Sequence, residues 1–105
     1  AIVLGERILT SGIIPVDPAT GEVKTTVNEA AEQAFSNLRN LLEDAGSGMD
    51  KVLKTTVFIA NMDDFAAINE VYAKYFPEPY PARSCVEVSR LPKDVLLEVE
   101  AIAEK

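Results

Sequence analysis

A strand with an arginine near its centre offers the clearest chemistry in this sequence. In the segment 80–88, which reads Tyr-Pro-Ala-Arg-Ser-Cys-Val-Glu-Val, side chains alternate between two faces, so Arg83, Cys85 and Glu87 share one face. A guanidinium held on an extended strand can bind a carboxylate through two parallel hydrogen bonds. Arg83 is therefore the first candidate for binding a small carboxylate ligand.

A second charged strand follows after a short loop. Glu98 and Glu100 share one face of the segment 95–102, whose other face is apolar. The connection is short enough to predict an antiparallel pair, which would bring Arg83 and a carboxylate onto one surface of the sheet. Two interpretations stay open. This surface is an anion site, or its charges form ion pairs, with Glu87 or Glu98 as the partner of Arg83.

Three further positions stand out against the surrounding pattern. Asn69 interrupts the apolar stripe of a predicted helix, where its amide either ties down a neighbouring backbone or points into a ligand pocket. Ser11 and Gly12 lie inside a predicted strand, which indicates either a bulge or the close approach of another group. Cys85 is either a small buried apolar residue or a nucleophile. We favour the first, because no histidine is present to activate its thiol.

Composition argues against several classes of function. The net charge of −7 and the scattered Lys and Arg residues oppose binding to nucleic acid. The absence of histidine removes Ser-His triads and His-ligated metals, and no calcium-loop spacing occurs, so we expect no metal. No glycine-rich phosphate motif predicts a nucleotide cofactor. No apolar run approaches about 18 residues and the single cysteine fits a reducing compartment, so we expect a cytoplasmic protein without membrane contact.

The hydrophobic pattern predicts one α+β domain over residues 1–105. In chain order, the expected elements are a strand over 7–16, a return strand at 22–24, a helix from the capping box at Thr26 to Gly46, a strand over 52–60, a helix from Asn61 or Asp63 to Pro77, and the two charged strands. Two helices would then pack on one face of a largely antiparallel or mixed sheet. We expect Val86 to face the helices, which leaves Arg83, Cys85 and Glu98 on an uncovered face that a neighbouring subunit would partly cover.

Several of these segments form a recognisable set. They are Ser11-Gly12-Ile13-Ile14-Pro15, Asp17-Pro18-Ala19-Thr20-Gly21, Lys54-Thr55-Thr56-Val57-Phe58, Asn69-Glu70-Val71-Tyr72, Pro81-Ala82-Arg83-Ser84-Cys85-Val86-Glu87-Val88 and the segment from Leu97 to Ala103. With them the sequence closely resembles the reactive-intermediate deaminase family (RidA, also called YjgF) along essentially its whole length. The resemblance implies a chorismate-mutase-type α+β fold and a homotrimer with ligand pockets between subunits. It also implies hydrolysis of 2-imino acids, such as 2-iminobutanoate and 2-iminopropanoate, to 2-oxo acids and ammonia without a cofactor.

The resemblance also implies roles for individual residues. Arg83 would bind the substrate carboxylate, helped by backbone groups around Cys85. The pair Ser11-Gly12 and Asn69 would line the pocket, and Glu98 would hold the attacking water.

Two features depart from the family pattern. Members of the family usually begin with a further strand ending in a Gly-Pro-Tyr-Ser-Gln-type segment, whose tyrosine reaches the pocket. This sequence starts just after that place, so we expect that strand to be missing from it. Ile13 also stands where a glutamine is common.

Three functions are compatible with such a pocket to different degrees. The favoured one is imine deamination, and its main alternative is a non-catalytic regulator that binds a 2-oxo acid or another small carboxylate in the same pocket. Arg83 serves both, whereas a water-directing Glu98 is needed only by the enzyme. A ribonuclease, as some relatives were formerly described, fits poorly with the net charge of −7 and the lack of histidine.

Overall fold

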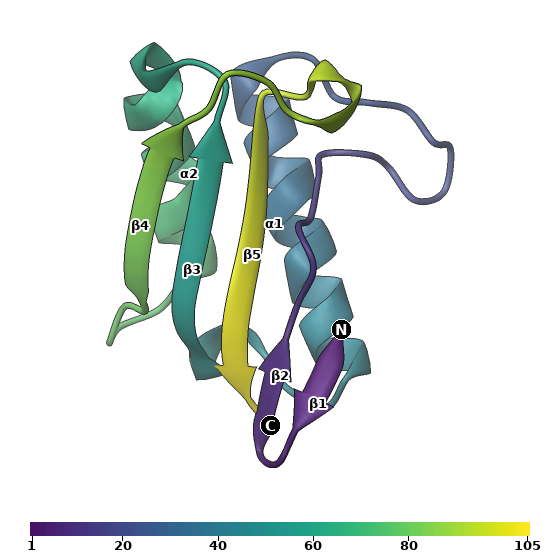
Figure 1. The fold of residues 1–105 in the computed structure, drawn as a ribbon, viewed down its shortest axis with the longest axis vertical. Coiled ribbons are helices and arrows are strands. Elements are labelled where there is room, and N and C mark those ends of the chain that lie inside the picture. Colours follow the sequence, from purple (N-terminus) through teal and green to yellow (C-terminus); the bar gives the residue numbers. More distant parts are fainter.

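A mixed five-stranded sheet with two helices on one face makes up the computed structural model, which describes residues 1–105 (Figure 1). The strands are β1 (Ile2–Leu4), β2 (Arg7–Leu9), β3 (Val52–Ile59), β4 (Ala82–Glu87) and β5 (Leu97–Glu104), in the order β1-β2-β5-β3-β4. The helices are α1 (Val27–Asp44) and α2 (Phe65–Tyr75), and short 3-10 turns span Met49–Lys51, Met62–Asp64 and Pro92–Asp94. The predicted class, two helices packed on one face of a mixed sheet, is confirmed.

The core lies between the helices and the inner face of β3 and β5. Alternate residues of β5 point inward, and all four of them are buried: Leu97, Val99, Ala101 and Ala103. Helix α1 covers them with a buried apolar stripe, which comprises Ala30, Ala31, Ala34, Phe35, Leu38 and Leu42. The helical spacing predicts four of these residues but not Ala30 and Phe35, and it also includes Leu41 and Ala45, which are only half-buried. The inward face of β5 is as the sequence predicts.

Helix α1 ends as expected but begins differently. Gly46 adopts a positive φ of 87° beyond its end, and the Ser47 N–H donates a hydrogen bond of 2.8 Å to the Leu42 carbonyl. Thr26 holds the N-cap position with an extended backbone, but its side chain makes no capping hydrogen bond. The predicted capping box is therefore wrong in its hydrogen bonding, although the start of the helix is correct.

The predicted strand over 7–16 is correct only for its first three residues, Arg7–Leu9. Only Arg7–Leu9 pairs as β2, and a short strand that the sequence analysis did not predict, β1, pairs with it. The following segment bonds to β5 at two places: the Thr10 N–H donates a hydrogen bond of 3.0 Å to the Ala101 carbonyl, and Ile13 exchanges two hydrogen bonds of 2.7 and 3.0 Å with Val99. Pro15 offers no N–H to a ladder, so pairing cannot continue through it.

The predicted antiparallel pairing of the last two strands is also wrong. β3 lies between them, pairing antiparallel with β5 and parallel with β4. The chain runs β3, α2, β4, and a strand that follows a crossover helix returns parallel to the first strand. The crossover helix therefore decides the pairing, not the short loop before β5. It also leaves β4 at the edge of the sheet.

The two faces of β4 are the reverse of the prediction. Arg83 is in register with Thr55 and Cys85 with Val57, and both partners are buried on the helix side. Val86 instead points outward and is 43% exposed. Only the margin of α2 covers this edge strand, so a long arginine can lie there with its stem on apolar surface and its charge near water.

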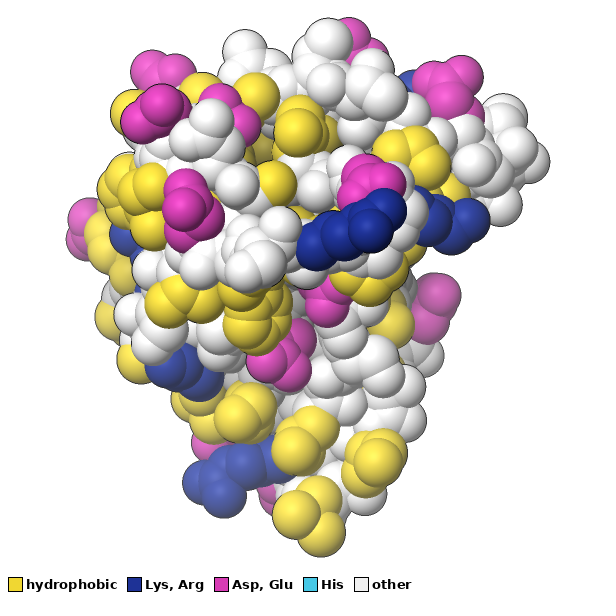
Figure 2. Space-filling model, turned by 45° about the horizontal axis from the view of Figure 1, so that its top comes forward, with side chains coloured by type: hydrophobic (Ala, Val, Ile, Leu, Met, Phe, Trp, Pro, Cys, Tyr) yellow, Lys and Arg dark blue, Asp and Glu magenta, His cyan; other side chains and the backbone are white.

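The outer face of the sheet is uncovered in a single copy of the chain. Figure 2 views this face obliquely and shows apolar side chains among charged ones along the sheet and at the tip formed by β1 and β2. Exposed apolar residues there include Ile2 and Leu4 (both 69%), Val86 and Ile102. Neither helix is both long and apolar enough to cross a membrane.

Candidate functional site

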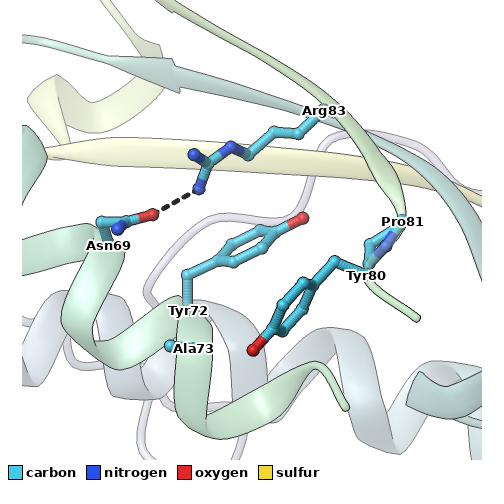
Figure 3. A pocket seen from close by; sticks show the side chains of 6 residues that line it. All are labelled: Asn69, Tyr72, Ala73, Tyr80, Pro81 and Arg83. Atoms are coloured by element: carbon cyan, nitrogen blue, oxygen red, sulfur yellow. Dashed lines mark hydrogen bonds between the residues drawn. The ribbon is translucent and has the colours of Figure 1, made fainter. Parts of the chain in front are cut away.

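Arg83 lies in a cluster of polar and aromatic side chains between β4 and α2 (Figure 3). Its Nη1 donates a hydrogen bond of 2.6 Å to Oδ1 of Asn69. The guanidinium carbon lies 4.6 Å from the ring centroid of Tyr72 and 5.4 Å from that of Phe65. An arginine on an aromatic face is held by charge and by stacking, so this guanidinium is oriented before any ligand arrives.

Contacts with the core fix the side chain of Tyr72 in place. Its hydroxyl forms a hydrogen bond of 2.8 Å with Oγ1 of Thr55, which is fully buried in β3. Its ring packs against Phe35 and Phe76, with centroids 5.5 and 4.3 Å apart. Asn69 and Tyr72 are three residues apart on α2, so both face the strand that carries Arg83.

No carboxylate pairs with Arg83 within the chain. The ion pairs of the structure are Lys24–Glu22, Lys74–Glu32 and Arg90–Asp94. Glu87 instead accepts a hydrogen bond of 2.7 Å from the Met62 N–H. Ion pairing of Arg83 with Glu87 or Glu98, left open by the sequence, is therefore contradicted. The guanidinium keeps donors that no carboxylate of the chain satisfies.

Asn69 does not tie down a backbone. Its side-chain oxygen accepts from Arg83 and its side chain lines a cavity, so the backbone interpretation is wrong and the ligand-pocket interpretation stays a prediction. The cavity has a volume of about 450 Å³. It lies between α2 and the start of β4 and is lined by Asn69, Tyr72, Ala73, Tyr80, Pro81 and Arg83.

The protonation of the neighbouring groups follows from their burial. Burial raises the pKa of the Tyr72 hydroxyl, and its hydrogen bond to Thr55 and the charge of Arg83 oppose that rise. Burial likewise raises the pKa of the Cys85 thiol, against the smaller effect of Arg83. Cys85 is half-buried and packs against the core. A thiol with a raised pKa is a poor nucleophile, which favours the apolar interpretation of this cysteine.

Glu98 and Gly12 form a second group on the outer face of the sheet. Glu98 is in register with Phe58 of β3 and is half-buried, and its neighbours Leu97 and Val99 point inward. A Cβ on Gly12 would collide with Oε2 of Glu98, so a glycine is needed for this carboxylate to lie where it does. Of the two explanations for Ser11-Gly12, the close approach of another group is therefore correct. Ser11 and Gly12 are both exposed.

The predicted site residues thus fall into two groups. Arg83, Asn69 and Cys85 lie on the helix side of the sheet, whereas Gly12 and Glu98 lie against each other on the outer side. The expectation that Arg83 and Glu98 share one face is wrong, because the parallel pairing of β4 fixes Arg83 beside the inward-facing Thr55.

Sequence reasoning missed four residues around Arg83. The guanidinium of Arg83 stacks on the ring of Tyr72, and Thr55 forms a hydrogen bond with the Tyr72 hydroxyl. Ala73 and Tyr80 line the cavity. Tyr72 belongs to an apolar stripe that also contains ordinary core residues, so its periodicity alone gives no functional signal. The signal that could have indicated a functional role for Tyr72 was its position on the same helix face as Asn69, three residues away.

Removing the Tyr72 hydroxyl should destabilise the protein. Tyr72→Phe leaves Oγ1 of Thr55 buried without a partner, which costs about 1–3 kcal/mol in the free energy of unfolding. The double variant Tyr72→Phe with Thr55→Val removes both partners and should cost less than the two single changes together. Urea unfolding at one fixed protein concentration measures this difference. Strictly additive losses would contradict the pairing of the two hydroxyls.

The whole chain matches a known family and its solved structures. The profile of the family described as Endoribonuclease L-PSP matches residues 1–105. The chain is 50% identical over 103 residues to the 2-iminobutanoate/2-iminopropanoate deaminase of Escherichia coli K12, a match that covers 95% of this chain and 80% of that protein. RidA from the Antarctic bacterium Psychrobacter superposes with a TM-score of 0.96 at 36% identity, covering 99% of this chain and 85% of that one. Escherichia coli TdcF with bound serine superposes with a TM-score of 0.94 at 48% identity, covering 99% and 84%. With its full length matched in sequence and in fold, this chain belongs to the Endoribonuclease L-PSP family, the family of the RidA and YjgF proteins.

Proposed function

We propose that this protein hydrolyses 2-imino acids, such as 2-iminobutanoate and 2-iminopropanoate, to 2-oxo acids and ammonia. The observation that carries the proposal is Arg83, an oriented guanidinium beside a cavity with no carboxylate of its own chain to bind. The relative from Escherichia coli, 50% identical, bears the name of this activity. A net charge of −7 opposes a polyanionic substrate, so a small imino acid is preferred over RNA.

Arg83 would hold the substrate by its carboxylate. A guanidinium offers two parallel N–H donors to a carboxylate, and Asn69 and Tyr72 restrict its rotation. Orientation matters because fixing the reactants in the correct geometry removes much of the entropic barrier to a bimolecular reaction. TdcF, a related protein, was solved with bound serine, whose α-carboxylate is the same chemical group.

Glu98 would supply the attacking water from a second copy of the chain. Within one copy Arg83 and Glu98 lie on opposite faces of the sheet, so one small substrate cannot contact both. The exposed apolar residues of the outer face and of β1 favour contact between copies. We therefore place each site between two subunits of a homotrimer, with Arg83 from one subunit and Gly12 and Glu98 from its neighbour. Light scattering should give about three times the monomer mass.

The reaction needs few groups. Glu98 takes a proton from water as the water oxygen bonds to the imine carbon, and the electron pair of the C=N bond moves to nitrogen. Glu98 passes this proton to the nitrogen, which restores its carboxylate, and the carboxylate then takes the hydroxyl proton of the tetrahedral intermediate and delivers it to the nitrogen. As the C–N bond breaks and the carbonyl forms, the nitrogen leaves as ammonia. Imine and water are thereby converted to 2-oxo acid and ammonia without oxidation or reduction.

A second candidate function uses the same pocket without turnover. Arg83 and Asn69 suffice to bind a small carboxylate, and the bound serine of TdcF is an amino acid rather than an imine. In this interpretation the protein is a regulator that responds to a 2-oxo acid. Glu98 separates the two functions, because a carboxylate sensor has no need of a base that directs water.

The test is the release of 2-oxobutanoate. A threonine dehydratase generates 2-iminobutanoate continuously, and its conversion is followed with and without this protein. We expect acceleration over spontaneous hydrolysis. The absence of any acceleration, with the protein at the trimer mass, would reject the enzyme and leave the binding function.

A further inference from the structure

The cavity beside Arg83 continues along helix α2. Its polar end is formed by Arg83 and Asn69, and its other end by Ala73 and Tyr80, with Tyr72 between them (Figure 3). Asn69 and Ala73 are four residues apart on α2, so the two ends are about 6 Å apart along the helix axis. A carboxylate bound at Arg83 would therefore have an elongated space open beside it.

This space is larger than the smallest imino acids require. The cavity holds about 450 Å³. Even at about 30 Å³ per non-hydrogen atom, the share of a water molecule in the liquid, 2-iminobutanoate would fill only roughly 200 Å³. Beside one copy of the chain, there is therefore room for a side chain larger than that of 2-iminobutanoate.

The lining of the far end indicates which kind of side chain. Tyr72 is buried and rigid, whereas Tyr80 is 59% exposed and lies beside it across the cavity. Pro81 adds a further apolar surface, and Ala73 leaves room where any larger residue would protrude. Flat aromatic groups pack well against tyrosine rings in offset or edge-to-face geometry. Arg83 is the one charged residue that a single copy of the chain contributes to the lining.

We infer that the cavity is a side-chain subsite that selects 2-imino acids with an aryl side chain, with Ala73 as the residue that sets their size. This inference rests on the proposed function. It requires a supplying reaction that oxidises the α-amine of an aromatic amino acid to the imine, as amino-acid oxidases do. The carboxylate of that imine binds at Arg83, and its ring lies against Tyr80 and the exposed edge of Tyr72, next to Ala73.

Binding of product analogues tests the subsite without requiring turnover. Calorimetry on the assembled protein should show phenylpyruvate binding about tenfold or more tightly than pyruvate, since an apolar subsite discriminates by size. Ala73→Leu fills the far end with a good helix former and should abolish this preference. The matched control is Ala66→Leu, an exposed alanine on the same helix outside the cavity, which should keep the preference.

Turnover gives the second measurement. With imines generated by an amino-acid oxidase, Ala73→Leu should lower kcat/KM for the phenylalanine-derived imine about tenfold more than for 2-iminopropanoate. Equal affinity for pyruvate and phenylpyruvate, or an unchanged ratio in Ala73→Leu, would overturn the subsite and leave the deaminase standing. If the unchanged protein accelerated no imine, the deaminase would fail, while the calorimetric ratio would still decide the subsite.

Discussion

Arg83→Ala should lose most of the affinity for substrate and keep the assembly. Removing a charge-assisted bidentate pair from the proposed site between subunits should cost roughly 2–4 kcal/mol, or about 30-fold to 1000-fold in Kd. Arg83 makes no ion pair within its own chain, and its loss removes only its hydrogen bond to Asn69 and its contacts with the rings of Phe65 and Tyr72, so the melting temperature should fall only modestly. Calorimetry with 2-oxobutanoate measures the affinity, and light scattering checks that the mass stays at three times the monomer.

The matched variant is Arg83→Lys. An ammonium keeps the charge but offers a point donor where a planar fork is needed, so lysine should not rescue binding. A purely structural arginine would give the reverse result, with alanine lowering thermal stability and lysine largely restoring it. Wild-type turnover in Arg83→Ala would contradict the carboxylate clamp.

Glu98→Gln should separate catalysis from binding. Glutamine has nearly the shape of glutamate and fits beside Gly12, but it cannot accept a proton from water. We expect kcat for 2-iminobutanoate to fall by about 10²-fold to 10⁴-fold, the usual contribution of a general base, with little change in the affinity for 2-oxobutanoate. Steady-state kinetics and calorimetry on the same preparation provide both values.

The opposite outcome for Glu98→Gln is equally informative. If turnover persisted at the wild-type rate, Glu98 would not direct the water. Gly12→Ala serves as an independent probe of the same carboxylate, because its methyl group would displace the Glu98 side chain without changing any charge. It should lower kcat as well, and its effect should add little to that of Glu98→Gln.

Local periodicity predicted the elements better than their pairing. The stripe of α1 and the alternation of β5 are set by burial on one side, and the sequence carries that pattern directly. The pairing of β4 depends on where α2 returns the chain, which is a property of the whole fold. The short loop before β5 therefore misled the prediction of a final hairpin.

The sequence singled out candidate residues but not their arrangement in space. Arg83, Asn69 and the Gly12 position stood out because a charge, an amide or a glycine interrupts an apolar pattern. Period-two alternation tells which residues share a face of one strand but not which face meets the helices. The sequence therefore could not reveal that Arg83 lies on aromatic rings of α2 while Glu98 lies on the other side of the sheet.

The most direct test of a site shared between subunits is complementation between two inactive variants. Arg83→Ala and Glu98→Gln chains are co-expressed with different affinity tags, and trimers carrying both tags are purified in two steps. In each mixed trimer one of the inter-subunit sites receives Arg83 from a Glu98→Gln chain and Glu98 from an Arg83→Ala chain. We expect about a third of the wild-type turnover of 2-iminobutanoate to return, while each variant alone stays inactive. If both residues acted from the same chain, no mixed trimer would contain an intact site, and mixtures as inactive as their parents would contradict the account.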